Sequence, residues 1–246
     1  MKLIWKLLAF LTVAAIVCFV GLAGWLYLYT ADLPPITQLQ EFNPVSESEA
    51  RLRICDSSES IVRVVPFDKF GPHLLPAVKA AEGEPDPFSP FHALIADLRQ
   101  QRHVGRYSSQ LARTMVCQHK ALPRALEVVR VANAIERKFN EEQVLAIYLN
   151  RVYLGGGAYG VEAGANHYFG RHASDLSLSQ AALLASLIRS PSLYSPNSHP
   201  ERATQRRNLV IDELAKNGTV PTAEAEVAKA SGLSLVQSPE ANLSDR

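Results

Sequence analysis

Positively charged side chains are concentrated in one stretch of the chain, from Gln101 to Asn140. This stretch has eight Lys or Arg residues and only two acids, Glu127 and Glu136, although the whole chain has a formal net charge of +1. Such a run can bind an anionic ligand, or it can be the solvated face of helices, and the charge pattern alone leaves both open. The overall charge gives no argument for a nucleic-acid partner.

The cysteines and histidines form no metal-binding motif. Cys18 lies in an apolar stretch, so only Cys55 and Cys117 remain; these two can pair in an oxidising compartment or stay as thiols. The seven His residues are scattered, with no pair at the spacing of metal ligands. We therefore predict no His/Cys metal site.

A glycine-rich pattern between Tyr148 and Gly170 is too specific for generic helix packing. It reads Tyr-Leu-Asn-Arg-Val-Tyr-Leu-Gly-Gly-Gly-Ala-Tyr-Gly-Val-Glu-Ala-Gly-Ala-Asn-His-Tyr-Phe-Gly, and its glycines permit positive φ angles or close approach of the backbone. This pattern resembles the fourth signature of glycosyltransferase family 51, the peptidoglycan glycosyltransferases. Residues 176–191 and 194–203 resemble the fifth signature and the helix after it, and residues 65–82 are similar to the approach to the first.

The resemblance extends over nearly the whole chain and implies a fold and a function. Members of this family polymerise lipid II into glycan strands and have a mainly helical, lysozyme-like fold. In their reaction a sugar hydroxyl attacks an anomeric carbon that carries undecaprenyl pyrophosphate. A carboxylate takes the hydroxyl proton, and cationic groups or a metal stabilise the departing pyrophosphate. A divalent metal, Mg or Mn, is therefore a candidate cofactor, although no ligand motif in this chain indicates one.

The first signature of the family supplies the base as the Glu of Glu-Asp-x-x-Phe-x-x-His-x-Gly. Here Glu82 follows two alanines as the resemblance requires, but Gly83 replaces the Asp, and a segment with the Phe and His positions is missing. Glu82 is our candidate catalytic base, and Glu84 is the alternative. The competing interpretation of either residue is a solvated loop acid.

The third signature, Arg-Lys-x-x-Glu, supplies the second carboxylate of the family. Counting back without gaps from Tyr148 places Val128 at that position, whereas Arg124-Ala-Leu-Glu127 fits the pattern only with one extra residue inside the helix. One residue turns a helix by about 100°, so Glu127 reaches the cleft only if a π-bulge absorbs the shift. Glu127 is therefore the second candidate catalytic residue.

Further substrate-binding candidates follow from the same resemblance. The second signature, Gly-x-Ser-Thr-Ile-Thr-x-Gln followed by a cation, is matched only in part by residues 105–113. Glu141, Ala146 and Ile188 stand where the family has a Lys, a Glu and a Pro. We predict substrate contacts, with the cations facing the pyrophosphate, from Ser108, Gln110, Arg113, Arg124, Tyr148, Asn150 and Arg189.

The elements that must position these residues are mostly helices. Two β-type runs, 52–55 and 61–65, predict a small hairpin. The predicted fold is mainly α: a lysozyme-like glycosyltransferase domain with a small β-hairpin near its N-terminus, preceded by one transmembrane helix. Periodicity and breaker residues predict helices over 74–81, 92–101, 109–120, 124–139, 141–150, 161–169, 176–188 and 200–216.

The N-terminal stretch predicts a membrane anchor. Residues 7–30 carry no charge, and as a helix they cover ~36 Å, more than the ~30 Å hydrocarbon core of a bilayer. Lys2 and Lys6 precede the stretch and Asp32 follows it, which favours a cytoplasmic N-terminus and an outer body. A cleaved signal peptide is the alternative, but its shorter apolar core ends in small residues, whereas Tyr-Leu-Tyr stands here. We expect a single-pass protein of the bacterial inner (cytoplasmic) membrane with a periplasmic body.

The predicted organisation has five parts: a cytoplasmic tail (1–6), the anchor (7–30), an extended linker (31–48), a glycosyltransferase family 51-like domain (49–220) and a loosely ordered C-terminal tail (221–246). The chain contains no Ser-x-x-Lys. We therefore expect the layout of the monofunctional, membrane-anchored members of the family, without a transpeptidase module.

Three functions are compatible with these patterns. The first is a glycosyltransferase that polymerises lipid II for the cell wall, with Glu82 as base. The second is a non-catalytic member that binds lipid II, glycan strands or other wall-synthesis proteins as a scaffold. The third is a lysozyme-like hydrolase with one surviving Glu. The C-terminal signatures are nearly intact and the carboxylate-bearing signatures are altered, so whether the domain is active stays open.

Overall fold

The computed structural model describes residues 2–30, 36–43, 48–52, 60–82, 105–116 and 124–236. The predicted helix over 92–101, the alternative base Glu84, and the pair Cys55 and Cys117 lie outside these ranges. In chain order the elements are α1 (Lys2–Thr30), η1 (Ile36–Phe42), β1 (Ser48–Leu52), β2 (Ser60–Val64), η2 (Phe67–Lys69), α2 (Gly71–Glu82), α4 (Arg106–Met115), α5 (Arg124–Lys138), α6 (Glu141–Arg151), α7 (Val161–Phe169), η3 (Ala173–Asp175), α8 (Leu178–Arg189), α9 (Pro200–Lys216) and α10 (Thr222–Ala230).

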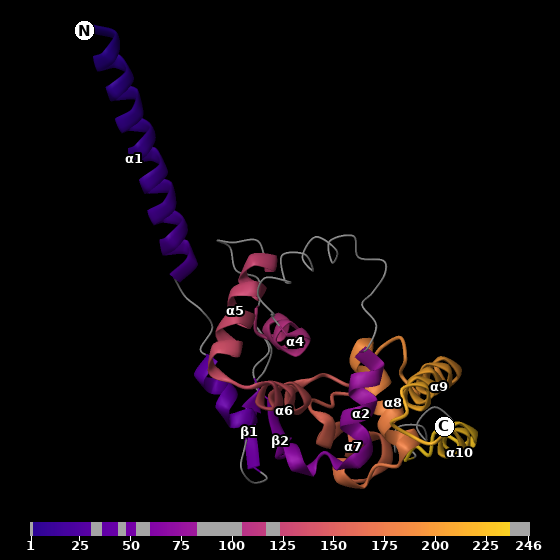
Figure 1. Ribbon diagram of the computed structural model, residues 1–246. Helices are drawn as coiled ribbons and strands as arrows, with labels where there is room; N and C mark the ends of the chain where they lie inside the picture. The colour runs from indigo at the N-terminus through magenta and orange to yellow at the C-terminus, as the bar shows by residue number, and fades with distance from the viewer. Residues whose placement is uncertain are drawn as a thin grey trace, which may run out of the picture.

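Most of these elements are helices, with one two-stranded antiparallel sheet near the N-terminus (Figure 1). The predicted mainly α fold with a small β element is therefore confirmed. Six predicted helices correspond to α2 and α5–α9. Two of them begin where the sequence places a capping box: Asn140 with Gln143 before α6, and Ser177 with Gln180 before α8.

Helix α1 extends away from the body of the molecule (Figure 1). Its described apolar side chains, such as Phe10, Val17 and Trp25, are exposed. Across the part of the chain that the structure describes, no helix is both long and apolar enough to cross a membrane. The predicted anchor over residues 7–30 is therefore not confirmed and stays a prediction.

Strands β1 and β2 form the predicted hairpin, with Ala50 opposite Val62 in the register. Every second residue points into the core, so Ala50 and Leu52 of β1 are buried together with Val62 and Val64 of β2. The first strand begins earlier than the predicted run 52–55, because its buried face is made by Ala50 and Leu52. Residues 53–59 lie outside the described ranges.

The predicted extended linker contains a folded segment. Residues 36–42 form the 3₁₀ helix η1, whose Leu39 and Phe42 are almost fully buried. These two side chains are three residues apart and therefore fall on one side of a 3₁₀ helix. The guanidinium of Arg151 stacks 4.4 Å from the centre of the Phe42 ring and covers it. The prediction of an extended linker over 31–48 is wrong for this part, because its apolar residues pack under α5 and α6.

The body has two hydrophobic clusters that share α6. The first cluster is built from α2, α6, α7, α8, α9 and α10, and the second from η1, the sheet, α4, α5 and α6. Leu145 and Leu149 of α6 belong to the first cluster, and Val144 and Ile147 to the second. Helix α6 therefore fixes the two halves of the body relative to each other.

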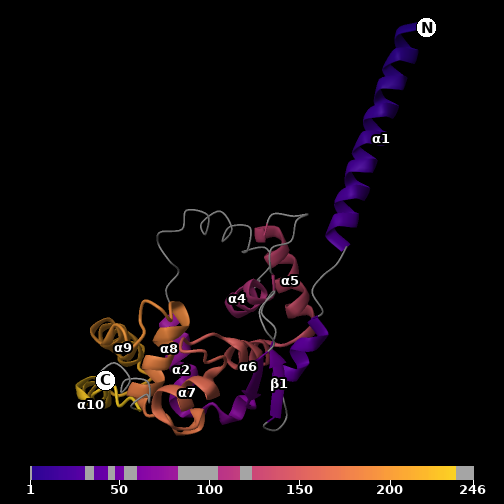
Figure 2. The ribbon, with the colours of Figure 1, turned by 180° about the vertical axis from the view of Figure 1, so that it is seen from behind.

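The C-terminal half is a layered helical unit in which α8 packs against both α2 and α9 (Figure 2). The predicted loosely ordered tail is wrong up to residue 236, because α10 packs on this unit through Ala225 and Ala228. Buried Arg207 of α9 binds the chain at the end of α10: its guanidinium donates to the carbonyls of Lys229 and Ser231, both at 2.8 Å. Residues 237–246 lie outside the described ranges.

Candidate active site

A cavity of about 700 Å³ opens where α2, α4, α5 and α6 meet. Helix α2 contributes Lys79, which lies one turn before Glu82, the last residue of that helix. The cavity thus joins the end of the helix that carries the candidate base to three elements that follow later in the chain. Its other lining residues are Gly105, Tyr107, Ser108, Glu136, Phe139, Asn140, Glu141 and Val144.

The first turn of α4 is held to the end of α5 by one carboxylate. The backbone N–H of Gly105 donates to Oε1 of Glu136. A carboxylate at the start of a helix also interacts favourably with the helix dipole. Helix α4 therefore begins at Arg106, whereas the sequence predicted a loop up to Ser108 and a helix over 109–120. The consequence is that Ser108 is fixed in the cavity wall, with only 2% of its surface exposed.

Tyr148 lies behind the cavity wall. Its ring packs against that of Tyr107, with a distance of 5.9 Å between the ring centres and an angle of 40° between the planes. Tyr107 lines the cavity, whereas Tyr148 is buried in the first hydrophobic cluster. Tyr148 is thus placed to support the ring that faces the cavity.

The charges at the cavity come from different residues than the sequence suggested. Lys79 supplies a cation, and Glu136 and Glu141 supply carboxylates. Among the described side chains that line this cavity, none is one of the eight cations counted between 101 and 140. Among the described residues, no group of three His, Cys, Asp or Glu side chains gathers to hold a metal ion. The described lining thus offers the two carboxylates of Glu136 and Glu141 and no set of ligands that fits a resident Mg or Mn.

The two candidate catalytic carboxylates are placed differently. Glu82 ends α2, next to the cavity-lining turn. Glu127 lies in the first turn of α5 and is 5% exposed. Helix α5 is a regular α-helix throughout, without the π-bulge that Glu127 requires to reach the cleft. Glu127 does not line the described cavity.

Asn150 lies inside the body and binds backbone groups there. Its side chain is fully buried and is hydrogen-bonded to the backbone of Val65 and Phe42. The amide oxygen and nitrogen are both used in these bonds. We therefore leave Asn150 out of the proposed set of substrate contacts.

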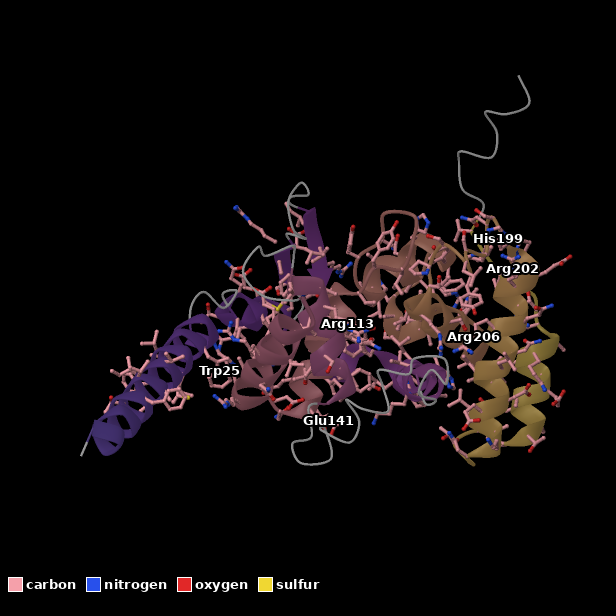
Figure 3. All side chains as sticks on the ribbon, turned by 90° about the horizontal axis from the view of Figure 1, so that it is seen from above. Trp25, Arg113, Glu141, His199, Arg202 and Arg206 are labelled. Atoms are coloured by element: carbon pink, nitrogen blue, oxygen red, sulfur yellow. The ribbon has the colours of Figure 1, made fainter. Side chains whose placement is uncertain are left out.

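The remaining predicted site residues are dispersed over the body. Arg113 is exposed on α4 (Figure 3), and Gln110 on the same helix is half-buried. Arg124 begins α5, and exposed Arg189 ends α8. Of the predicted residues, Ser108 is thus the one among the described side chains that lines the cavity.

Sequence reasoning missed Lys79, Tyr107 and Glu136 as cavity residues. A signal for Lys79 was available, because it lies one helical turn before Glu82. In the sequence, Glu136 stood out only as one of the two acids in the basic stretch from Gln101 to Asn140. Its role depends on Gly105, which lies 31 residues earlier in the chain, and no local pattern pairs the two.

Comparison with known proteins identifies the family of this chain. The model of the family described as Transglycosylase matches residues 58–215, more than half of the chain. The chain therefore belongs to the transglycosylase family, as the sequence resemblance indicated.

Individual relatives agree with this assignment. Penicillin-binding protein 1A of Aquifex aeolicus is 35% identical over 245 residues, a match that covers 94% of this chain and 34% of the relative. Penicillin-binding protein 1A of Vibrio cholerae is 30% identical over 246 residues and covers 94% and 30%, respectively. The chain thus spans about a third of the length of these curated relatives. A crystal structure of penicillin-binding protein 1A from Haemophilus influenzae aligns over 79% of this chain and 22% of its own, with 20% identity and a TM-score of 0.39.

Proposed function

We propose that this protein is a peptidoglycan glycosyltransferase that polymerises lipid II into glycan strands. One observation carries the proposal: the turn of α2 before Glu82 and the first turn of α4 with Ser108 line the same cavity. Lys79 lies in the stretch that is similar to the approach to the first signature, and Ser108 lies in the stretch that matches the second signature in part. Two segments far apart in the chain, which the resemblance links to one reaction, supply residues to one cavity, and this supports the proposal.

The proposed reaction uses Glu82 as general base. Its carboxylate accepts the proton of the attacking sugar hydroxyl, whose oxygen forms a bond to the anomeric carbon. The bond from that carbon to the pyrophosphate oxygen breaks, and the electron pair leaves with the pyrophosphate. Lys79 is the described cation of the cavity, and the Ser108 hydroxyl is a hydrogen-bonding group in its wall.

The location of the protein is part of the proposal. The uncharged stretch 7–30 would hold the chain in the bacterial inner membrane, with the body on the periplasmic side. Lipid II hangs from a membrane lipid, so a tethered body meets its substrate at the bilayer surface. Other wall-synthesis proteins are candidate partners at the same surface.

Polymerisation of labelled lipid II by the purified full chain tests the proposal. With a divalent metal in the buffer, we expect glycan polymer from the wild type. We expect a loss of at least about 100-fold in Glu82→Gln, because the amide cannot accept the proton. The matched control Glu142→Gln changes an exposed acid of α6 and should polymerise normally. Polymer from Glu82→Gln at the wild-type rate would contradict the role of Glu82, and Glu84→Gln then tests the alternative base.

One observation favours a second candidate function, a non-catalytic protein that binds lipid II or glycan strands. The Glu that best fits the third signature, Glu127, is buried away from the described cavity. The same assay separates the candidates. Tight binding of labelled lipid II without polymer supports the scaffold, and shortening of preformed glycan strands supports a lysozyme-like hydrolase.

A further inference from the structure

One hydrogen bond connects α9 to the end of α2. Nη2 of Arg206 donates to the carbonyl oxygen of Ala81 at 2.9 Å, across 125 positions of the chain. Ala81 is the second-to-last residue of α2 and is buried in the first cluster. Figure 3 shows Arg206 on the side of α9 that faces the body. Arg206 therefore contacts the backbone one residue before Glu82.

The physical effect of this bond is local to the last turn of α2. The last four carbonyls of a helix have no partner within the helix, and a cation near them is favoured by the helix dipole. A hydrogen bond from a charged donor is also stronger than a neutral one. Because residues 81 and 82 share one planar peptide, fixing the Ala81 carbonyl also fixes the Cα of Glu82.

Other features of Arg206 do not suit a residue kept for stability alone. Its Nε is buried and has no hydrogen-bond partner among the described residues, which is unfavourable for a donor taken out of water. Burial lowers the pKa of Arg206, and the nearby positive charge of Arg189 lowers it further, whereas Tyr194 raises it. The guanidinium of Arg206 is thus half-buried near the positive charge of Arg189, and its buried Nε has no hydrogen-bond partner among the described residues.

We infer that Arg206 is a positioning residue that fixes the last turn of α2 and thereby the place of Glu82 beside the cavity. The inference rests on the proposed function, since Glu82 needs a fixed place only if it acts on substrate. A general base must lie within hydrogen-bond reach of the proton that it accepts, and a displacement of about 1 Å can lower the rate by about 100-fold. The guanidinium acts through the backbone of α2 and need not touch the substrate.

Two substitutions of Arg206 and one control test the inference in the full-length protein. Arg206→Met removes the donor and the charge but keeps an extended side chain. Arg206→Lys keeps the charge and one donor that can approach the carbonyl. Arg202→Met removes an exposed arginine from the same helix, one turn earlier. Circular dichroism first establishes that each variant is folded.

Two readouts are taken on these variants. The first is amide hydrogen exchange in the last turn of α2, which needs no activity. We expect faster exchange in Arg206→Met, partial recovery in Arg206→Lys, and no change in Arg202→Met. The second is polymerisation kinetics: kcat should fall at least about 10-fold in Arg206→Met with little change in KM, and Arg206→Lys should restore part of it.

The two readouts make the possible failures distinguishable. A wild type that makes no polymer overturns the proposed function, and exchange alone then decides whether Arg206 fixes α2. Unchanged exchange in a folded Arg206→Met variant overturns the inference whatever the activity. Changed exchange with unchanged kcat in an active enzyme shows a purely structural bond and also overturns the positioning role.

Discussion

The side-chain amide of Asn150 binds both backbone groups of Val65, a residue 85 positions earlier. Oδ1 accepts from the Val65 N–H at 3.0 Å, and Nδ2 donates to the Val65 carbonyl at 2.9 Å. Nδ2 also donates to the Phe42 carbonyl at 3.0 Å. One buried side chain on α6 therefore pairs with the backbone of Val65 just after β2, and connects η1 to the same point.

Removing this amide should destabilise the protein. Asn150→Ala leaves one N–H and two carbonyls buried without these partners, so we expect a loss of about 3 kcal/mol in the free energy of unfolding. Urea unfolding followed by circular dichroism measures it. Asn166→Ala changes an exposed asparagine of α7 and should stay within about 0.5 kcal/mol of the wild type. Equal stabilities for the two variants would show that the buried amide contributes little.

The backbone turn after α6 should reject a side chain at Gly160. This residue has φ of +85°, and an added Cβ would lie 2.7 Å from the Asn150 carbonyl oxygen. Gly157 is a matched control, because its φ is +77° but its Cβ would meet nothing within 4 Å. We expect Gly157→Ala to cost about 1–2 kcal/mol from the left-handed conformation alone, and Gly160→Ala clearly more. Similar unfolding free energies in urea would rule out the contact with Asn150 as the cause.

The pair of Glu162 and His172 should make stability depend on pH. Nδ1 of His172 lies 2.7 Å from Oε1 of Glu162, whose other oxygen accepts from the Ala173 N–H. This hydrogen bond, followed by the negative charge of Glu162, raises the pKa of His172 above its ordinary value of 6.5. Since the folded state binds the proton more tightly, the contribution is fully present below about pH 6.5 and is lost as the pH rises through the folded pKa.

A variant comparison tests this dependence. The difference in unfolding free energy between the wild type and His172→Gln should be largest near about pH 6 and should shrink toward about pH 9. His199→Gln, at an exposed histidine just before α9, serves as the control and should show no such trend. A difference that stays constant with pH would contradict the ion pair.

Arg207 should determine whether α10 stays attached. Its guanidinium is 1% exposed and donates to the Ser179 hydroxyl as well as to carbonyls at the end of α10. Arg207→Met should destabilise the protein by about 3 kcal/mol, because several charged hydrogen bonds are lost at once. Limited proteolysis should then cut near residues 222–230 sooner than in the wild type. Arg202→Met, at an exposed arginine of the same helix, should be cut at the wild-type rate.

The glycine-rich signature shows how far the sequence alone could predict the fold. Its glycines marked a turn between α6 and α7, and five of them have positive φ in the structure: Gly155, Gly156, Gly157 and Gly160 in the turn, and Gly170 at the end of α7. The predicted helix over 141–150 corresponds to α6, which begins after the capping box of Asn140 and Gln143. These predictions succeeded because turns, caps and helix periodicity depend on residues within a few positions of each other.

The environments of the candidate site residues could not be predicted from local sequence patterns. Asn150 is part of the same signature, yet its side chain binds Val65 and Phe42 inside the body. Glu127 fits the third signature only with one extra residue inside the helix, but α5 is a regular α-helix that buries Glu127 in its first turn. The prediction of a loosely ordered tail was wrong up to residue 236, because Arg207 binds carbonyls at the end of α10 and just after it.

The sequence by itself determined the family and the order of α2 and α5–α9, and it placed Glu82 directly after a predicted helix. Only the tertiary structure decided that Ser108 and Lys79 share a cavity with Glu136, and that Arg206 contacts the backbone beside Glu82. The physical reason is the separation along the chain of the residues that interact. A helix forms from interactions between near neighbours, whereas the partner of a buried polar atom is set by the packing of segments far apart in the chain.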